Sequence, residues 1–132
     1  MSFNTTNIPA RLAQTLIIDT SATAGSQAQD NIFSGVTLAN KIYSIRLDNT
    51  NIASPSYFKA QFATSYSDQN HPGTVLYVAA NSTAEYVFPE GYPSGGFSTG
   101  FSFIGTSTTT QTGTQTDPSG NGSFKVTILA GT

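Results

Sequence analysis

The sequence contains no cysteine and no tryptophan, and it has a single histidine among 132 residues. Without cysteine the chain can form neither a disulfide framework nor a thiolate metal site. The histidine, His71, precedes Pro-Gly in a turn-like segment and has no second histidine or cysteine to share a metal with. A catalytic base would also need a nucleophile and an orienting carboxylate. We therefore interpret His71 as a turn residue.

Charge is also scarce, because only 9% of the residues are charged and the net charge is -2. The five Lys and Arg residues are scattered, whereas nucleic-acid binding requires them to cluster. No apolar run approaches the roughly 18 residues of a membrane span. The N-terminus lacks a basic segment followed by an apolar one, so no signal peptide is evident. We expect no nucleic-acid partner and no membrane partner.

Apolar and polar residues alternate with a period of two in several segments, which are separated by Pro, Gly, Asn and Asp. This pattern is typical of antiparallel strands. It predicts strands near residues 12–19, 41–48, 57–63, 74–79, 84–88, 98–104 and 123–129. Since no segment reads as a helix, we expect an all-β, single-domain antiparallel β-sandwich, jelly-roll-like, with long polar loops. The alternation also places Phe58, Phe62, Phe101 and Phe103 in the core.

Three connections are less regular than the strands. The segment Asn81-Ser-Thr83 separates two predicted strands that we expect to form a hairpin. Residues 31–38 fit either a short strand or a turn of helix. The low-complexity segment Thr106–Gly122 has too little apolar surface to offset the entropy of ordering it, which predicts an exposed, mobile loop that tolerates shortening.

The first eleven residues carry two isolated apolar side chains, Phe3 and Ile8, in a polar segment, and Pro9 disfavours a helix at Ile8. The segment is either a frayed end or an arm that docks on a neighbour. We divide the chain into an N-terminal arm (1–11) and a β-sandwich domain (12–132). With Phe3 and Ile8 in the arm, Tyr66 and Tyr92 in predicted loops complete our set of candidate partner-contact residues.

No motif in the sequence carries recognisable chemistry. The segments 48–51 and 68–70 offer oxygen ligands for Ca²⁺, but they lack the ligand spacing of an EF-hand loop. Glu85 and Glu90 have the residue type of a glycosidase pair, yet nothing in the sequence requires them to converge across a cleft. The glycines at 95, 96 and 100 are not followed by the Lys-Ser/Thr of a phosphate loop. We therefore predict no catalytic, cofactor-binding or metal-binding residues, and a protein that is not an enzyme.

The order of segments from 41 to 129 resembles a family of small β-rich virion proteins of tailed bacteriophages. The matching segments cover about two thirds of the chain. They are Lys41-Ile-Tyr-Ser-Ile-Arg-Leu-Asp-Asn49, Tyr57-Phe-Lys59, Pro72-Gly-Thr74, Phe88-Pro-x-Gly91, Phe97-Ser-Thr-Gly-Phe-Ser-Phe103 and Phe124-Lys-Val-Thr-Ile128. The segment 92–96 is longer here than in the family pattern, and residues 1–40 lie outside the resemblance.

The resemblance implies a non-enzymatic structural protein located in the virion. Our first expectation is a capsid decoration (cement) subunit that docks on the outside of the phage head. The alternative is a tail, baseplate or fibre-associated module, for which binding of a host surface glycan is one role. The expected partners are the major capsid protein or other virion subunits, and further copies of this chain in a homo-oligomer, for which we predict a trimer.

Overall fold

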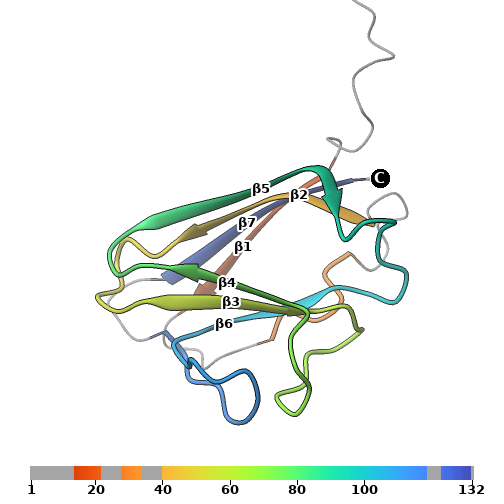
Figure 1. The fold of residues 1–132 in the computed structure, drawn as a ribbon. Helices are drawn as coiled ribbons and strands as arrows, with labels where there is room; N and C mark the ends of the chain where they lie inside the picture. The colour runs from red at the N-terminus through yellow and green to blue at the C-terminus, as the bar shows by residue number, and fades with distance from the viewer. Residues whose placement is uncertain (1–13, 22–27, 34–39, 119–122, 132) are drawn as a thin grey trace, which may run out of the picture.

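The computed structural model describes residues 14–21, 28–33, 40–118 and 123–131, and for 14–21 the backbone alone. The described strands form two sheets that face each other (Figure 1). One sheet has four strands in the order β1-β7-β2-β5, and the other has three in the order β4-β3-β6. Every pairing is antiparallel. The strands are β1 (Gln14–Ser21), β2 (Lys41–Asp48), β3 (Ser56–Gln61), β4 (Thr74–Val78), β5 (Thr83–Tyr92), β6 (Ser102–Thr106) and β7 (Ser123–Gly131).

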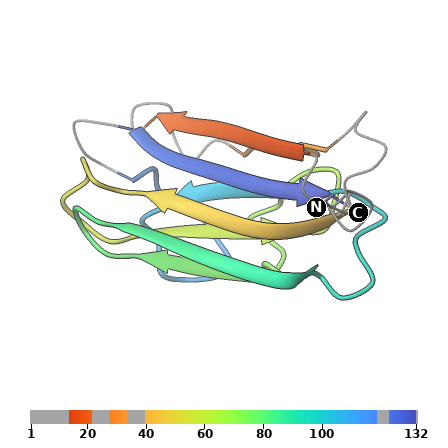
Figure 2. The same cartoon turned by 90° about the horizontal axis from the view of Figure 1, so that it is seen from above.

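The strand pairs are nested one inside another along the chain. The innermost pair is β3 with β4, and β2 pairs with β5 around it. A bridge between Gln29 and Phe103 of β6 comes next, and β1 with β7 is the outermost pair. This nesting, divided between two facing sheets, is the topology of a jelly roll in which the bridge at Gln29 takes the place of one strand. Figure 2 shows the two layers from above. The expected all-β sandwich is confirmed.

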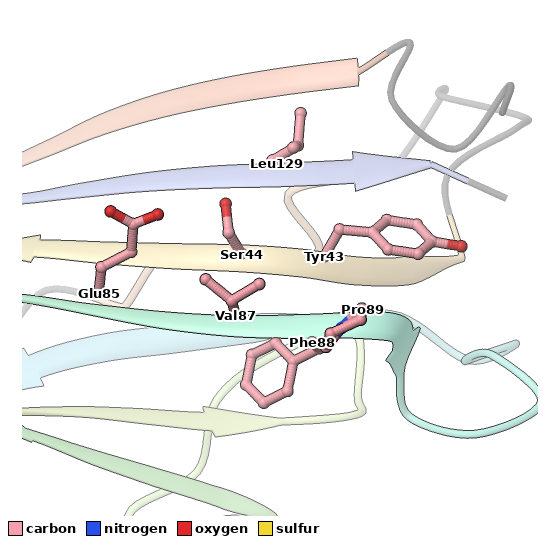
Figure 3. A pocket seen from close by; sticks show the side chains of 7 residues that line it. All are labelled: Tyr43, Ser44, Glu85, Val87, Phe88, Pro89 and Leu129. Atoms are coloured by element: carbon pink, nitrogen blue, oxygen red, sulfur yellow. The ribbon is translucent and has the colours of Figure 1, made fainter. Parts of the chain in front are cut away.

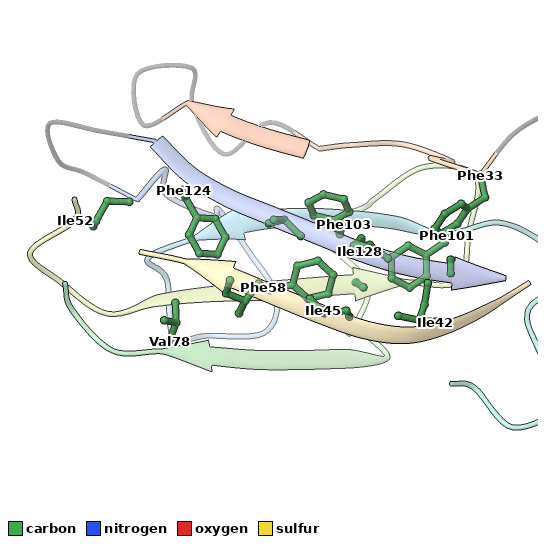
Figure 4. Close-up of a cluster of buried hydrophobic side chains, with 14 residues drawn as sticks. Phe33, Ile42, Ile45, Ile52, Phe58, Val78, Phe101, Phe103, Phe124 and Ile128 are labelled. Atoms are coloured by element: carbon green, nitrogen blue, oxygen red, sulfur yellow. The ribbon is translucent and has the colours of Figure 1, made fainter. Parts of the chain in front are cut away.

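The core lies between the sheets and is built mainly from the inward residues of the central strands (Figure 4). Phe58, Phe101 and Phe103 are buried as predicted, whereas Phe62 is only partly buried and packs against the edge of the core. The rings of Phe58 and Phe103 lie 4.9 Å apart between centroids. Aromatic pairs at such distances add stability beyond the apolar area that they bury. On β7 the inward residues Phe124, Val126 and Ile128 are fully buried.

The predicted hairpin between the strands at 74–79 and 84–88 is wrong. β4 pairs with β3 in the three-stranded sheet, and β5 pairs with β2 in the other. The connection at residues 79–82 therefore crosses from one sheet to the other. The predicted strand 98–104 is displaced, because β6 begins only at Ser102. The backbone of Phe97 instead donates to Asn40 O, and the Phe101 carbonyl accepts from Ile32 N.

Two buried amide side chains fasten loops to the sandwich. Asn49 donates from its side chain to the carbonyls of Ser54 and Ala79 at 2.9 and 3.0 Å, and its Oδ1 accepts from the Ser56 hydroxyl. Gln61 donates to the carbonyls of Ser67 and Asn70 and accepts from the Ser67 amide, each at 2.9 Å. Since a buried amide costs free energy unless its hydrogen bonds are made, these contacts define the loop positions.

Lys59 fastens a third loop, and its side chain is fully buried on the outer side of β3. The ammonium donates to the carbonyls of Thr108 and Thr110 at 2.7 and 2.6 Å, and to Gln115 Oε1 at 2.9 Å. Three acceptors match the three N–H bonds of the ammonium group. Burial lowers the pKa of Lys59, while the negative charge of Asp68 opposes that effect.

The loop after Thr106 is exposed at several residues, as expected, but hydrogen bonds to Lys59 and to the loop after β3 anchor residues 107–118 to the sandwich. Gln115 is buried, and its side-chain NH₂ donates to Thr110 O and Gly113 O. The amide of Gly113 donates to Asp68 O, which joins this loop to the loop after β3. Both loops lie below the three-stranded sheet in Figure 1. The carbonyl groups of this loop accept hydrogen bonds from the buried ammonium group of Lys59. These bonds, rather than apolar side chains, hold the loop in place.

The outer edge of β4 is closed by a tyrosine from the opposite sheet. The hydroxyl of Tyr86 on β5 donates to Tyr77 O and accepts from Tyr77 N. These backbone groups point away from β3, the partner strand of β4. An edge strand with free backbone groups is a template for pairing with another chain. The Tyr86 hydroxyl binds the backbone groups in the middle of the outer edge of β4 and so disfavours the pairing of another strand there.

We expect the substitution Lys59→Met to lower the free energy of unfolding by about 1.5–3 kcal/mol, the range for hydrogen bonds to charged groups. It should also accelerate amide hydrogen exchange at Gly113 and Thr116 more than tenfold, because the loop loses its anchor. Chemical denaturation and exchange mass spectrometry measure the two effects. Lys125→Met is the matched control on an exposed lysine of β7, for which we expect less than about 0.5 kcal/mol. Equal exchange in the two variants would contradict the anchor.

We expect the substitution Tyr86→Phe to cost about 0.5–1.5 kcal/mol, the usual range for a lost hydrogen bond. It should also increase self-association, because the Tyr77 backbone becomes available to another strand. Sedimentation velocity at increasing concentration measures that association. Tyr77→Phe is the control, since it removes a hydroxyl from β4 and leaves that of Tyr86 in place. If the Tyr86→Phe protein associates no more than the control, the hydroxyl of Tyr86 is not what prevents strand pairing at the edge of β4.

Candidate partner-contact surface

The outer faces of the two sheets differ in how far they are covered. On the three-stranded sheet the outward side chains of the paired strands β3 and β6 lie beneath the loops 62–73 and 107–118, and most are buried: Lys59, Gln61, Ser102, Ile104 and Thr106. On the four-stranded sheet the outward side chains of β2 and β5 include several exposed residues: Arg46, Thr83, Glu85, Val87 and Pro89. Within the described residues, the broad uncovered face is that of the four-stranded sheet.

One end of this open face carries mixed charges. Arg46 lies opposite Glu85 on β5, and Asp48 lies opposite Lys125 on β7. The hydroxyl and the amide of Thr50 donate to Asp48 Oδ1 at 2.7 and 3.1 Å and lower the pKa of Asp48 below its usual value of 3.8. The positive charges of Arg46 and Lys125 lower it further. This end is therefore polar and charged with both signs.

The other end of the open face is shaped by a bulge. Ile42 is paired with Tyr92 and Ser44 with Val87, so Tyr43 alone stands opposite residues 88–91 of β5. On its other side β2 also carries Tyr43 as an extra residue, because Ile42 and Ser44 pair with the adjacent residues Ala130 and Leu129. Bulges bend the strand and redirect side chains. Here the bulge opens a hollow in the sheet surface.

Gly91 makes the bulge possible. Its φ is +84°, a conformation that side chains with a Cβ rarely adopt. A Cβ at this position would lie 2.8 Å from Lys41 Cδ and 3.1 Å from Tyr43 Cε1. The backbone of β5 can thus approach β2 closely at this point only because residue 91 is glycine. β5 thus continues to Tyr92, beyond the end of the predicted strand 84–88.

We call this depression the bulge hollow. Its volume is about 390 Å³, and its lining is Tyr43, Ser44, Glu85, Val87, Phe88, Pro89 and Leu129. Figure 3 shows Ser44, Val87, Glu85 and Leu129 on one side of the sheet and Phe88 on the other. Val87 is 60% exposed, the largest exposed fraction among the large hydrophobic residues that the structure describes. The hollow thus offers apolar surface, with one carboxylate and one hydroxyl beside it.

A second, smaller depression of about 280 Å³ lies beside the loop after β3 and includes His71. The Nδ1 of His71 lies 3.1 Å from Gln111 Oε1. This contact places the histidine against an amide rather than a carboxylate. No group of three or more His, Asp or Glu residues within the described ranges could hold a metal ion. In the described part of the chain, His71 and its neighbours form no recognisable catalytic arrangement.

The structure describes two of the four candidate contact residues, and it places them in different surroundings. Tyr66 lies in the loop after β3, where its amide donates to Asp30 Oδ1 and burial raises the pKa of its phenol to about 12. Tyr92 ends β5 and packs on Phe62, with its hydroxyl accepting from Thr74 Oγ1 at 2.9 Å. The side chain of Tyr92 thus helps to hold the segment around Thr74 in place, whereas Tyr66 is tied to Asp30 through its backbone amide. Their role in partner contact stays a prediction.

The other two candidates, Phe3 and Ile8, lie outside the described residues, and so does the proposed boundary between the arm and the domain. The sequence reasoning did not single out Val87 or Leu129. The alternation in 83–88 places Val87 on the polar side of its strand, between Glu85 and Pro89. A large aliphatic residue at an outward position was the signal that could have found it.

Comparisons with known proteins add little to what the geometry of this surface indicates. No family model matches the sequence, and no curated protein matches it. The coat protein of tobacco streak virus is a solved structure similar to 89% of this chain and 87% of its own, with 11% identity and a TM-score of 0.35. A TM-score this low does not by itself indicate a shared fold. Within the described part of the chain, no helix is long and apolar enough to cross a membrane.

Proposed function

We propose that this protein is a non-enzymatic structural subunit of a virus particle, and that it acts as a decoration subunit on the outside of a phage head. The observation that carries the proposal is the uncovered outer face of the four-stranded sheet, with Val87 exposed beside the bulge hollow. Exposed apolar surface bordered by polar residues is typical of protein contact sites. The resemblance of segments 41–129 to virion proteins of tailed phages supports the same role.

The distribution of polar groups also favours a docking role. The buried polar side chains of Asn49, Lys59 and Gln61 are all used to hold the protein's own loops. None of the three is directed at a substrate-sized cleft. Within the described residues, the molecule is thus a block with one covered and one uncovered sheet face. Such a block suits repeated docking on a symmetric shell, where its partners would be the major capsid protein and further copies of itself.

A tail or fibre module is the second candidate, and a specific patch favours it. Tyr77 is 47% exposed and Val75 is 42% exposed on β4, and the ring of Tyr77 lies 5.6 Å from that of Tyr57. Exposed tyrosine rings combine an apolar face with a polar tip and are enriched at interfaces. On a fibre, this pair would contact a sugar ring of a host glycan.

Locating the subunit on particles separates the two candidates. We expect gold label on a tagged subunit to cover the whole head in electron micrographs of purified particles, with many copies per particle. Label confined to the tail would favour the second candidate. Particles without label would contradict a virion location.

The role of the arm gives a further prediction. A chain that starts at Leu12 should melt within about 2 °C of the full chain, because a surface change away from the core alters stability by less than about 0.5 kcal/mol. The same chain should no longer be incorporated into particles, because the two apolar side chains of the arm are gone. Thermal unfolding and co-purification with particles measure the two effects. Normal incorporation would show that residues 1–11 are a frayed end.

A further inference from the structure

We propose that the bulge hollow of one copy binds the N-terminal arm, residues 1–11, of a second copy of this chain. The inference rests on the proposed function, because it takes the protein to be a subunit that assembles. It adds to that function the place where the arm is received. Because the arm and the hollow are different parts of the surface, two copies can exchange arms reciprocally, or several copies can pass them around a closed ring.

The hollow has the chemistry to receive apolar side chains. Val87, Pro89 and Leu129 supply aliphatic surface, and the buried Tyr43 also lines the hollow. Its volume of about 390 Å³ lies at the small end of the range for pockets that enclose a ligand. This space suits one or two apolar side chains rather than an extended hydrophobic surface. An occupant with a few isolated apolar residues therefore fits better than a flat apolar partner.

The arm has that composition. Four polar residues separate Phe3 from the adjacent pair Ile8-Pro9, and Arg11 is the one charged side chain in residues 1–11. Glu85 is the one charged residue in the lining of the hollow, and it lies opposite Arg46 of β2. Arg11 can therefore pair with Glu85 at the rim while an apolar residue of the arm enters the hollow. Charge pairs of this kind select the orientation of a contact more than they add to its strength.

The arm also leaves the domain at the correct end. Thr15 of β1 lies opposite Leu129, Leu129 lies next to Ser44, and Ser44 lies next to Val87. These four residues form one row across the sheet, and the row ends at the hollow. Gln14, where the described part of β1 begins, is therefore at the same end of the sheet as the hollow. In an assembly, arms and hollows of neighbouring copies lie close together if these ends face each other.

Distance alone would allow the arm to reach the hollow of its own copy. The row from Thr15 to Val87 crosses three strand spacings, or about 14 Å, and six extended residues span about 20 Å. The arm would, however, have to reverse its direction between Pro9 and Gln14. The intervening residues Ala10, Arg11, Leu12 and Ala13 include no Gly, Asn, Asp or Ser, the types that favour reversal together with Pro. This sequence favours the hollow of a neighbour.

Photo-crosslinking in the full chain tests the contact directly. Phe3 is replaced by p-benzoylphenylalanine in unlabelled protein, which is mixed with wild-type protein labelled with ¹⁵N. After irradiation and digestion, mass spectrometry identifies the joined peptides. We expect residue 3 to be joined to ¹⁵N-labelled peptides that contain residues 85–89 or 129. Joining to unlabelled peptides of its own chain alone would overturn binding by a second copy. Joining to any other surface, or none, would overturn the hollow as the receiver.

A pair of valine substitutions gives the matched comparison. Val87→Lys places a charge in the hollow, and Val75→Lys places the same charge on β4, at a valine that is also exposed. We expect Val87→Lys to lower the association constant of the full chain at least tenfold in sedimentation equilibrium, and Val75→Lys to leave it within twofold. A synthetic peptide of residues 1–11 should dissociate the wild-type oligomer. Equal effects of the two substitutions would overturn the proposal.

These measurements need no particles, so they separate the inference from the proposed function. If the wild-type chain decorates particles but Phe3 is never joined to the hollow, the inference fails and the proposed function stands. If the arm occupies the hollow but no particle carries the protein, the virion role fails while the contact between copies stands. A wild-type chain that remains monomeric, with no crosslinks between chains, overturns the inference. Native mass spectrometry of the assembled wild-type chain then tests the predicted trimer.

Discussion

The buried ammonium group of Lys59 decides which surface of this protein is open. A lysine with its charge fully removed from water is stable only if its N–H bonds are matched by acceptors. Here the acceptors are Thr108 O, Thr110 O and Gln115 Oε1, all from one loop. The loop must therefore lie over β3, and the outer face of the three-stranded sheet becomes part of the interior.

The outer face of the four-stranded sheet is open because the anchored loops lie elsewhere. Three buried polar side chains bind the carbonyl groups of loops: Asn49, Lys59 and Gln61. These loops lie over the three-stranded sheet or at the ends of the sandwich. No comparable loop among the described residues covers the outer side of β2 and β5. On that side the one departure from a regular surface is the bulge at Tyr43, which Gly91 permits. The hollow and the exposed Val87 are thus the features of the open face that a partner can recognise.

The sequence predicted the strands well where alternation is strong. The strand at 41–48 agrees with β2 at both ends, because Ile45 and Leu47 alternate with polar residues and turn formers stop the pattern. Alternation carries no information about the partner of a strand, which explains the wrong hairpin between β4 and β5. The nesting of pairs comes from the whole chain, and no local segment encodes it. The jelly-roll expectation rested on the number of strands and the absence of helices.

The errors at the surface have a different cause. Lys59 has the residue type of a solvent-exposed position, and the loop 107–118 has the composition of a disordered one. Every residue has a backbone carbonyl group, so the composition of this loop does not show that its carbonyl groups can bind the Lys59 ammonium group. The bulge hollow was missed because two bulges meet at Tyr43, and such irregularities are properties of paired strands. Tyr66 and Tyr92 were chosen for their place in predicted loops. In the structure Tyr66 binds Asp30 through its backbone amide, and Tyr92 ends β5 with its hydroxyl bound to Thr74.

The central claim is that partners meet the outer face of the four-stranded sheet. Hydroxyl-radical footprinting tests it most directly, because it reports the solvent exposure of individual side chains in the dispersed protein and in the assembled one. The account predicts that Val87 and Leu129 lose most of their labelling on assembly, while Val75 and Tyr77 keep theirs. Loss of labelling at Val75 and Tyr77, with Val87 and Leu129 unchanged, would contradict it.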